Sequence, residues 1–159
     1  MSSHTLKWAA TNADSLLADL DLPVAAYRAL LKLRGKAKAG GLIEMDQGSL
    51  GTLLNLSRPS VNAALRRLEL ARLVMKVRNG VYQINPMLAG YEHPEDAEAA
   101  VRAMPLADRL DDKRYFERYY KALAAYEDQL AVQRKKKADA AAAKKAAASR
   151  RRGALHAVG

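Results

Sequence analysis

Small polar and basic side chains gather in one short segment, between residues 57 and 67. If this segment is a helix, the outward side chains of the group are Ser57, Arg58, Ser60, Asn62, Ala63, Arg66 and Arg67. Arginine can grip guanine with two hydrogen bonds, asparagine can do the same with adenine, and an alanine methyl can touch the thymine methyl. Serine hydroxyls and free helix N–H groups can donate to phosphate. These groups suit the recognition of a nucleic acid better than bond-breaking chemistry.

A second basic group follows at Lys76, Arg78 and Asn79, near the tip of a predicted hairpin. Arginine is favoured in a narrow minor groove, and lysine can bind the phosphate backbone. Two other interpretations stay open. Lys76 and Arg78 can protect an exposed sheet edge from pairing, and Arg66 and Arg67 can be a solvated face or pair with Glu69.

Catalytic and metal-binding patterns are weak in this chain. The three histidines, His4, His93 and His156, are scattered, and there is no cysteine. The sequence contains no nucleophile elbow and no phosphate-binding glycine loop. We therefore expect no catalytic residues, no metal ligands, no cofactor, no small-molecule substrate and no enzymatic activity.

The elements that position the first group are two helices joined by a tight turn. Ser57 caps a predicted helix over residues 57–71, whose inward stripe is Val61, Ala64, Leu65 and Leu68. Asp46 caps the helix before it, residues 47–54. Farther upstream, Asp21 is the expected cap of a helix that runs to about Arg34, with Pro23 in its first turn. Residues 42–45 are a strand candidate, and leucines at 16, 17 and 20 suggest a short helix.

A hairpin follows the 57–71 helix. Asn79-Gly80 separates two runs rich in β-branched residues, and we expect both turn residues to take positive φ. Pro86 ends the second strand. The order helix, strand, helix, turn, helix, hairpin predicts a mainly α fold with a small β-wing, a winged helix-turn-helix domain over residues 1–90 with its core at 21–86.

Two segments of this predicted domain resemble known protein families. Residues 50–69, LGTLLNLSRPSVNAALRRLE, resemble the helix-turn-helix of MarR-like and Crp-like regulators. Residues 72–86, RLVMKVRNGVYQINP, are similar to the wing of RepL-type plasmid replication proteins. The resemblance implies sequence-specific binding of double-stranded DNA, with 57–71 in the major groove and wing 73–85 on the backbone or minor groove. It implies either a transcriptional regulator or a plasmid or phage replication initiator.

Beyond residue 90 the character of the chain changes. A helix is predicted from His93 to Met104, and a long one from Asp111-Asp112. Within the long helix, the apolar positions step by three and four residues: Phe116, Tyr119, Leu123, Tyr126 and Leu130. This seam suggests a helical extension over 91–133 that either pairs with a second copy or folds back, and we favour a homodimer.

Charge is uneven along the chain. The net charge of +10 combines +3 over residues 1–40, −2 over 41–56, +5 over 57–90, −4 over 91–133 and +8 over 134–159. The basic tail, 134–159, is rich in alanine, lysine and arginine, so it can continue the helix and neutralise phosphates, with a disordered end at 153–159. Such a tail also fits a solubilising extension or a nonspecific DNA-architectural protein, and a winged helix can instead dock a protein.

Neither a membrane span nor a signal-peptide layout is evident in the sequence. We therefore expect a cytoplasmic, bacterial protein associated with the nucleoid or a plasmid.

Overall fold

The computed structural model describes residues 6–157 of the chain. It is mainly helical, with one small three-stranded antiparallel sheet and a long C-terminal helix, which confirms the predicted layout at that level. The chain divides into two units, Met1–Tyr119 and Tyr120–Gly159. The predicted boundaries after residues 90 and 133 stay predictions.

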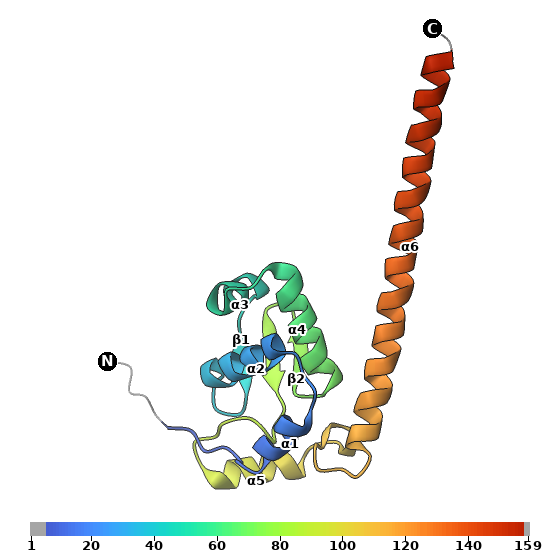
Figure 1. Ribbon diagram of the computed structural model, residues 1–159. Helices are drawn as coiled ribbons and strands as arrows, with labels where there is room; N and C mark the ends of the chain where they lie inside the picture. The colour runs from blue at the N-terminus through green and yellow to red at the C-terminus, as the bar shows by residue number, and fades with distance from the viewer. Residues whose placement is uncertain (1–5, 158–159) are drawn as a thin grey trace. The chain divides into compact units, whose positions relative to one another are not determined.

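The described part of the first unit contains four helices before its hairpin. They are α1 (Ala13–Asp19), α2 (Val24–Lys36), α3 (Gln47–Leu54) and α4 (Arg58–Leu70). Helix α4 packs against α2, α3 and the strand that follows it, and these elements lie together in Figure 1. The predicted inward stripe of α4 is buried in full: Val61, Ala64, Leu65 and Leu68.

Three short strands complete this part of the unit. They are β1 (Leu42–Glu44), β2 (Val74–Arg78) and β3 (Val81–Ile84), in the order β1-β3-β2. The turn between β2 and β3 contains Gly80 at φ 75°, but the prediction of a positive φ at Asn79 is wrong. The register shifts between Lys76 and Arg78, and such a bulge supplies twist that the turn would otherwise provide.

The start of α2 differs from the prediction. Pro23 is the N-cap residue, with an extended ψ of 148°, and no side chain caps the helix. The prediction that Asp21 caps α2 is therefore wrong, because the extended proline places Asp21 outside the first turn. The backbone carbonyl of Asp21 instead accepts a hydrogen bond from Arg67.

The segment after the sheet contains α5 (Pro94–Arg102), the short 3-10 helix η1 (Leu106–Asp108) and the start of α6 (Tyr115–Ala157). The prediction that α6 begins at residues 111–112 is wrong. The carboxylates there lie before the helix, where Asp111 pairs with Arg109 and Asp112 pairs with Arg118 in the first turn of α6. Tyr115 and Tyr119 are buried, so these two positions fold back onto the first unit.

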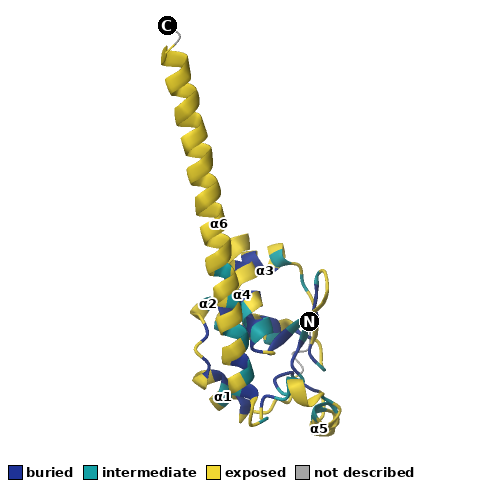
Figure 2. Ribbon diagram, turned by 90° about the vertical axis from the view of Figure 1, so that its right-hand side faces the viewer, coloured by how far each residue is buried: buried dark blue, intermediate teal, exposed yellow. Residues whose placement is uncertain are grey.

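The second unit is described over residues 120–157, all of which belong to α6. From residue 131 onward every described residue is exposed, as the yellow distal helix in Figure 2 shows. The predicted disorder at 153–159 is wrong for Gly153–Ala157, which are helical, because the arginines before Gly153 and the alanine after it favour helix. Val158 and Gly159 lie outside the described residues. Among helices of the described residues, none has the length and apolarity that crossing a membrane requires.

Candidate nucleic-acid interface

A broad groove of about 960 Å³ opens between the start of α3, the turn before α4 and the β2–β3 hairpin. It brings together four of the predicted site residues, which are Ser57, Arg58, Lys76 and Asn79. The other residues that line it are Asp46, Gln47, Gly48, Gly51, Thr52, Asn55, Leu56, Gly80 and Tyr82. Groups from both sides of the turn and from the hairpin therefore face one concave surface.

The turn between α3 and α4 is built from three local constraints. Asn55 takes the left-handed conformation at φ 54°, and the backbone N–H of Leu56 donates to the Gly51 carbonyl oxygen at 2.9 Å. A Cβ on Gly51 would lie 2.9 Å from the Leu56 carbonyl oxygen, so this approach needs glycine. Ser57 then caps α4 through the backbone N–H of Ser60. These contacts fix the start of α4 beside the groove.

The groove contains charges of both signs. Arg58 and Lys76 are exposed cations, and Asp46 is an exposed carboxylate that lines the same groove. The backbone N–H of Ser49 donates to Asp46 at 2.6 Å, and this hydrogen bond lowers the pKa of the Asp46 carboxyl. The carboxylate is thus ionised at neutral pH, where it caps α3 and adds a negative charge to the groove that Arg58 and Lys76 line.

The outward side of α4 carries a row of polar residues at four-residue steps. This outer row is Arg58, Asn62 and Arg66, all of them exposed, with exposed Ala63 beside it. Arg58 also lines the groove, so the outer row and the groove form one continuous surface. Arg66 pairs with Glu69 at 3.4 Å, which is the ion pair that the sequence had left open as an alternative.

Arg67 does not reach this surface. Its Nη2 donates to the Asp21 carbonyl oxygen at 3.0 Å and to the Tyr119 hydroxyl at 3.5 Å. Its Nε is buried and has no hydrogen-bond partner among the described residues. The residue lies on the side of α4 that faces the rest of the first unit, so its geometry suits bracing the helix rather than contacting a base.

The remaining predicted residues are exposed outside the groove. Ser60 accepts a hydrogen bond from the Ser57 hydroxyl at 3.0 Å, which keeps both hydroxyls at the start of α4. Arg78 is exposed on β2, an edge strand of this sheet. Lys76 lies on the same strand, so protection of the sheet edge and binding of a partner remain compatible with its position.

The structure adds α3 residues that sequence reasoning missed. Gln47, Thr52 and Asn55 line the groove beside Ser57. The sequence could have predicted them in part, because the helix before a recognition helix commonly crosses the nucleic-acid backbone.

The described part of the chain contains no cluster of metal-binding side chains. Across residues 6–157, no three histidine or acidic side chains are placed to hold a metal ion. His93 precedes α5, His156 lies near the end of α6, and His4 lies outside the described residues. The hydrogen-bonding groups of the groove and the outer row thus define the candidate site.

This site consists of a capped helix, a polar row along it and a hairpin with a basic edge. In comparisons with known proteins, the chain matches no protein-family model, no curated protein and no solved structure.

Proposed function

We propose that the first unit is a winged helix-turn-helix domain that binds double-stranded DNA at a specific sequence. In this proposal α4 enters the major groove, and the β2–β3 hairpin is the wing on the backbone or in the minor groove. The observation that carries the proposal is the exposed outer row, with Arg58 and Asn62 near the capped start of α4. The major groove, about 12 Å wide, admits one α-helix.

Phosphate contacts complete the proposed binding mode. Lys76 lines the groove from the hairpin, and Thr52 and Gln47 lie on α3, where that helix would cross the backbone. Contacts of this kind fix register and orientation, whereas the outer row supplies the base contacts that discriminate between sequences. The proposal assigns base reading to Arg58, Asn62 and Ala63, with Arg66 joining them when it leaves Glu69.

Two biological roles fit this activity. The chain is either a bacterial transcriptional regulator or a plasmid or phage replication initiator, in a nucleoid- or plasmid-associated cytoplasmic location. The resemblance of residues 50–69 and 72–86 supports both. Footprinting on the DNA that flanks its own gene separates them, because repeated direct sites favour replication and a palindrome over a promoter favours regulation.

A homodimer is part of the proposal, because helix-turn-helix proteins commonly bind two half-sites. Tyr119 is buried within its own chain, so we assign the contact with a second copy to Leu123 and Leu130, which are partly exposed. Sedimentation equilibrium tests this with Leu123→Glu/Leu130→Glu, which we expect to be monomeric. A monomeric unsubstituted chain would remove dimerisation from the proposal.

The central experiment selects bound duplexes from a random pool and then measures affinity for the selected and a scrambled duplex. We expect Arg58→Ala/Asn62→Ala to weaken binding to the selected duplex by about 1–3 kcal/mol for each base that is no longer recognised. The loss on the scrambled duplex is much smaller. Asn12→Ala/Arg114→Ala is the matched control, because it removes the same two residue types from exposed positions elsewhere.

Two outcomes would overturn the proposal. If no sequence is enriched from the pool, the domain is not a sequence-specific DNA binder. If both double variants lose equal affinity on both duplexes, the outer row does not read bases. Retention of cellular function by Arg58→Ala/Asn62→Ala would favour a winged helix that docks a protein.

A further inference from the structure

The distal part of α6 is strongly basic. Residues 134–157 contain nine lysines and arginines and one acid, Asp139, and every residue of this range is exposed. All of them belong to one helix. The positions of their side chains around the axis therefore follow from the helical period.

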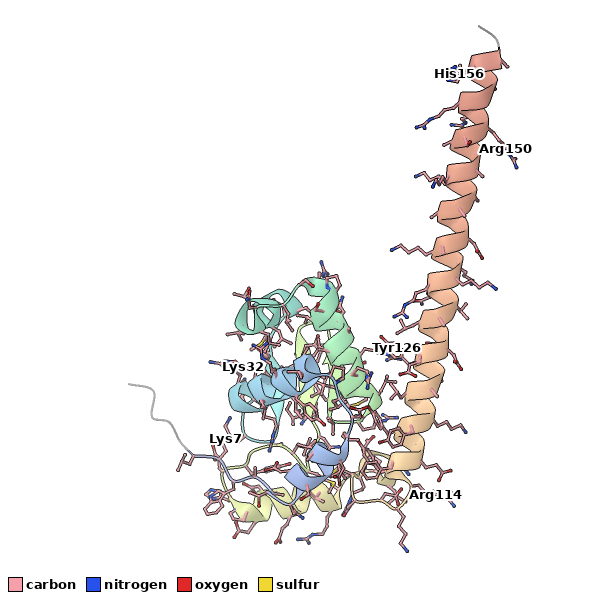
Figure 3. All side chains as sticks on the ribbon, in the orientation of Figure 1. Lys7, Lys32, Arg114, Tyr126, Arg150 and His156 are labelled. Carbon is pink, nitrogen blue, oxygen red and sulfur yellow. The ribbon has the colours of Figure 1, made fainter. Side chains whose placement is uncertain are left out.

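The charges are not evenly distributed around this helix. At about 100° per residue, six of the nine cations fall within a sector of about 120°. This cationic stripe is formed by Arg134, Lys137, Lys144, Lys145, Arg151 and Arg152. Lys135, Lys136, Arg150 and the single acid lie on the opposite side. Figure 3 shows the side chains of Arg150 and His156 leaving the helix in different directions.

The side opposite the stripe does not suit a membrane. Helices that lie on a bilayer bury tryptophan, phenylalanine or leucine on the side away from their cations. Within residues 134–157, the opposite side offers alanine as its apolar residue, and Leu155 falls on the stripe side. A peptide-binding groove on a partner protein would also need large anchors at helical spacing.

A second copy of the chain does not suit the stripe either. The positions seven residues apart that begin with Leu123 and Leu130 continue as Lys137, Lys144 and Arg151. A helix pair that buried the leucines would place like charges at these next positions, which is unfavourable. An apolar contact between copies therefore ends near Leu130, and the stripe stays available to a partner of opposite charge.

We propose that the cationic stripe binds along the phosphate backbone of duplex DNA, without reading its sequence. The segment is about 36 Å long at 1.5 Å per residue, close to one turn of B-DNA. Duplex DNA carries one negative charge per about 1.7 Å of its axis, so one turn offers more phosphates than the stripe has cations. This contact goes beyond the proposed function, since it needs no contribution from α4.

Two variants of the full chain with the same net charge test the proposal. The stripe variant is Lys137→Gln/Lys144→Gln/Arg151→Gln, and the control is Lys135→Gln/Lys136→Gln/Arg150→Gln. Each removes two lysines and one arginine, and circular dichroism confirms equal helix content. Affinity for a scrambled duplex is measured by fluorescence anisotropy over a range of salt concentrations. We expect the stripe variant to reduce the slope of log affinity against log salt by about 0.9 for each phosphate that is no longer bound, and the control to leave it unchanged.

Equal slopes for the two variants would overturn the proposal, because the cations on both sides of the helix would then contribute equally to DNA binding. Tighter binding to vesicles of phosphatidylserine than to the duplex would also overturn it and identify a lipid surface. Failure here is distinguishable from failure of the proposed function. Sequence preference is the ratio of affinities for the selected and scrambled duplexes, and the stripe variant leaves this ratio unchanged.

Discussion

The Tyr115 hydroxyl donates a hydrogen bond to the Ala71 carbonyl oxygen at 2.5 Å, which joins the first turn of α6 to the end of α4. Both residues are buried. The ring of Tyr115 stacks on that of Tyr119, with ring centroids 6.4 Å apart. The helix proposed to read DNA is therefore held at its C-terminal end by a residue 44 positions later in the chain.

Replacing Tyr115 with phenylalanine tests this connection. Tyr115→Phe leaves the buried Ala71 carbonyl without this donor, and we expect the free energy of unfolding to fall by about 1–3 kcal/mol. Urea denaturation measures it. Tyr119→Phe removes the longer 3.5 Å hydrogen bond with Arg67, so its effect is smaller. An equal effect of the two substitutions would contradict the special role of the Tyr115 hydroxyl.

Two glycines in helices give opposite predictions. Gly51→Ala places a Cβ against the Leu56 backbone oxygen at 2.9 Å, and we expect a loss of about 1–3 kcal/mol in unfolding free energy. Gly35→Ala, in α2, meets no atom within 4 Å and gains up to about 1 kcal/mol from helix propensity. Thermal denaturation of both proteins compares them, and tolerance of alanine at position 51 would show that the turn can open.

We expect the substitutions of Asn62 and Arg67 to affect DNA binding in different ways. Asn62→Ala removes an exposed amide from the outer row, so it relaxes the preference at one base position and costs about 1–3 kcal/mol on the selected duplex. Arg67→Ala removes the bond to the Asp21 carbonyl, so it lowers stability and weakens binding to all duplexes alike. Binding selections with each variant distinguish them. A change of base preference in Arg67→Ala would contradict the bracing role and show that Arg67 contacts a base.

Acid stability depends on two carboxylates before α6. The side-chain hydrogen bonds of Arg109 and Arg118 lower the pKa of Asp111 and Asp112, respectively. A lowered pKa in the folded state stabilises the protein above the unfolded value, about 4, and this stabilisation is lost as the pH falls through the folded value. We therefore expect Asp111→Asn/Asp112→Asn to lose less stability than the unsubstituted chain between pH 6 and pH 3. Parallel urea titrations at the two pH values measure this, and identical losses would contradict the ion-pair explanation.

Local signals in the sequence were sufficient for much of the fold. The caps at Asp46 and Ser57 were predicted because each side-chain oxygen precedes a helix by one residue, and both are confirmed. The hairpin was predicted from Asn79-Gly80, although its bulge was not. A bulge depends on how strands pair, and a single strand carries little signal of it.

The parts that the sequence did not predict depend on contacts between distant segments. Arg66 and Arg67 are adjacent and chemically identical, yet one is exposed and the other binds Asp21 and Tyr119. The helical period places them about 100° apart, but which of them contacts the rest of the protein depends on where Asp21 and Tyr119 lie. Asp21 lies 46 residues before Arg67 and Tyr119 lies 52 residues after it, so no local pattern shows these contacts.

Asn85 is the one buried polar residue among the described core side chains, and its amide donates to the carbonyl oxygens of Arg72 and Asp108 at 2.8 and 2.9 Å. The Asn85 side chain thus connects the end of α4 to η1. Arg72 follows α4 with a left-handed φ of 58°, and its carbonyl shares the Asn85 amide with Asp108 of η1. Thermal opening of η1 would therefore also loosen the end of α4. We expect hydrogen exchange to report a single cooperative event for these two segments, which are separated by more than thirty residues of chain.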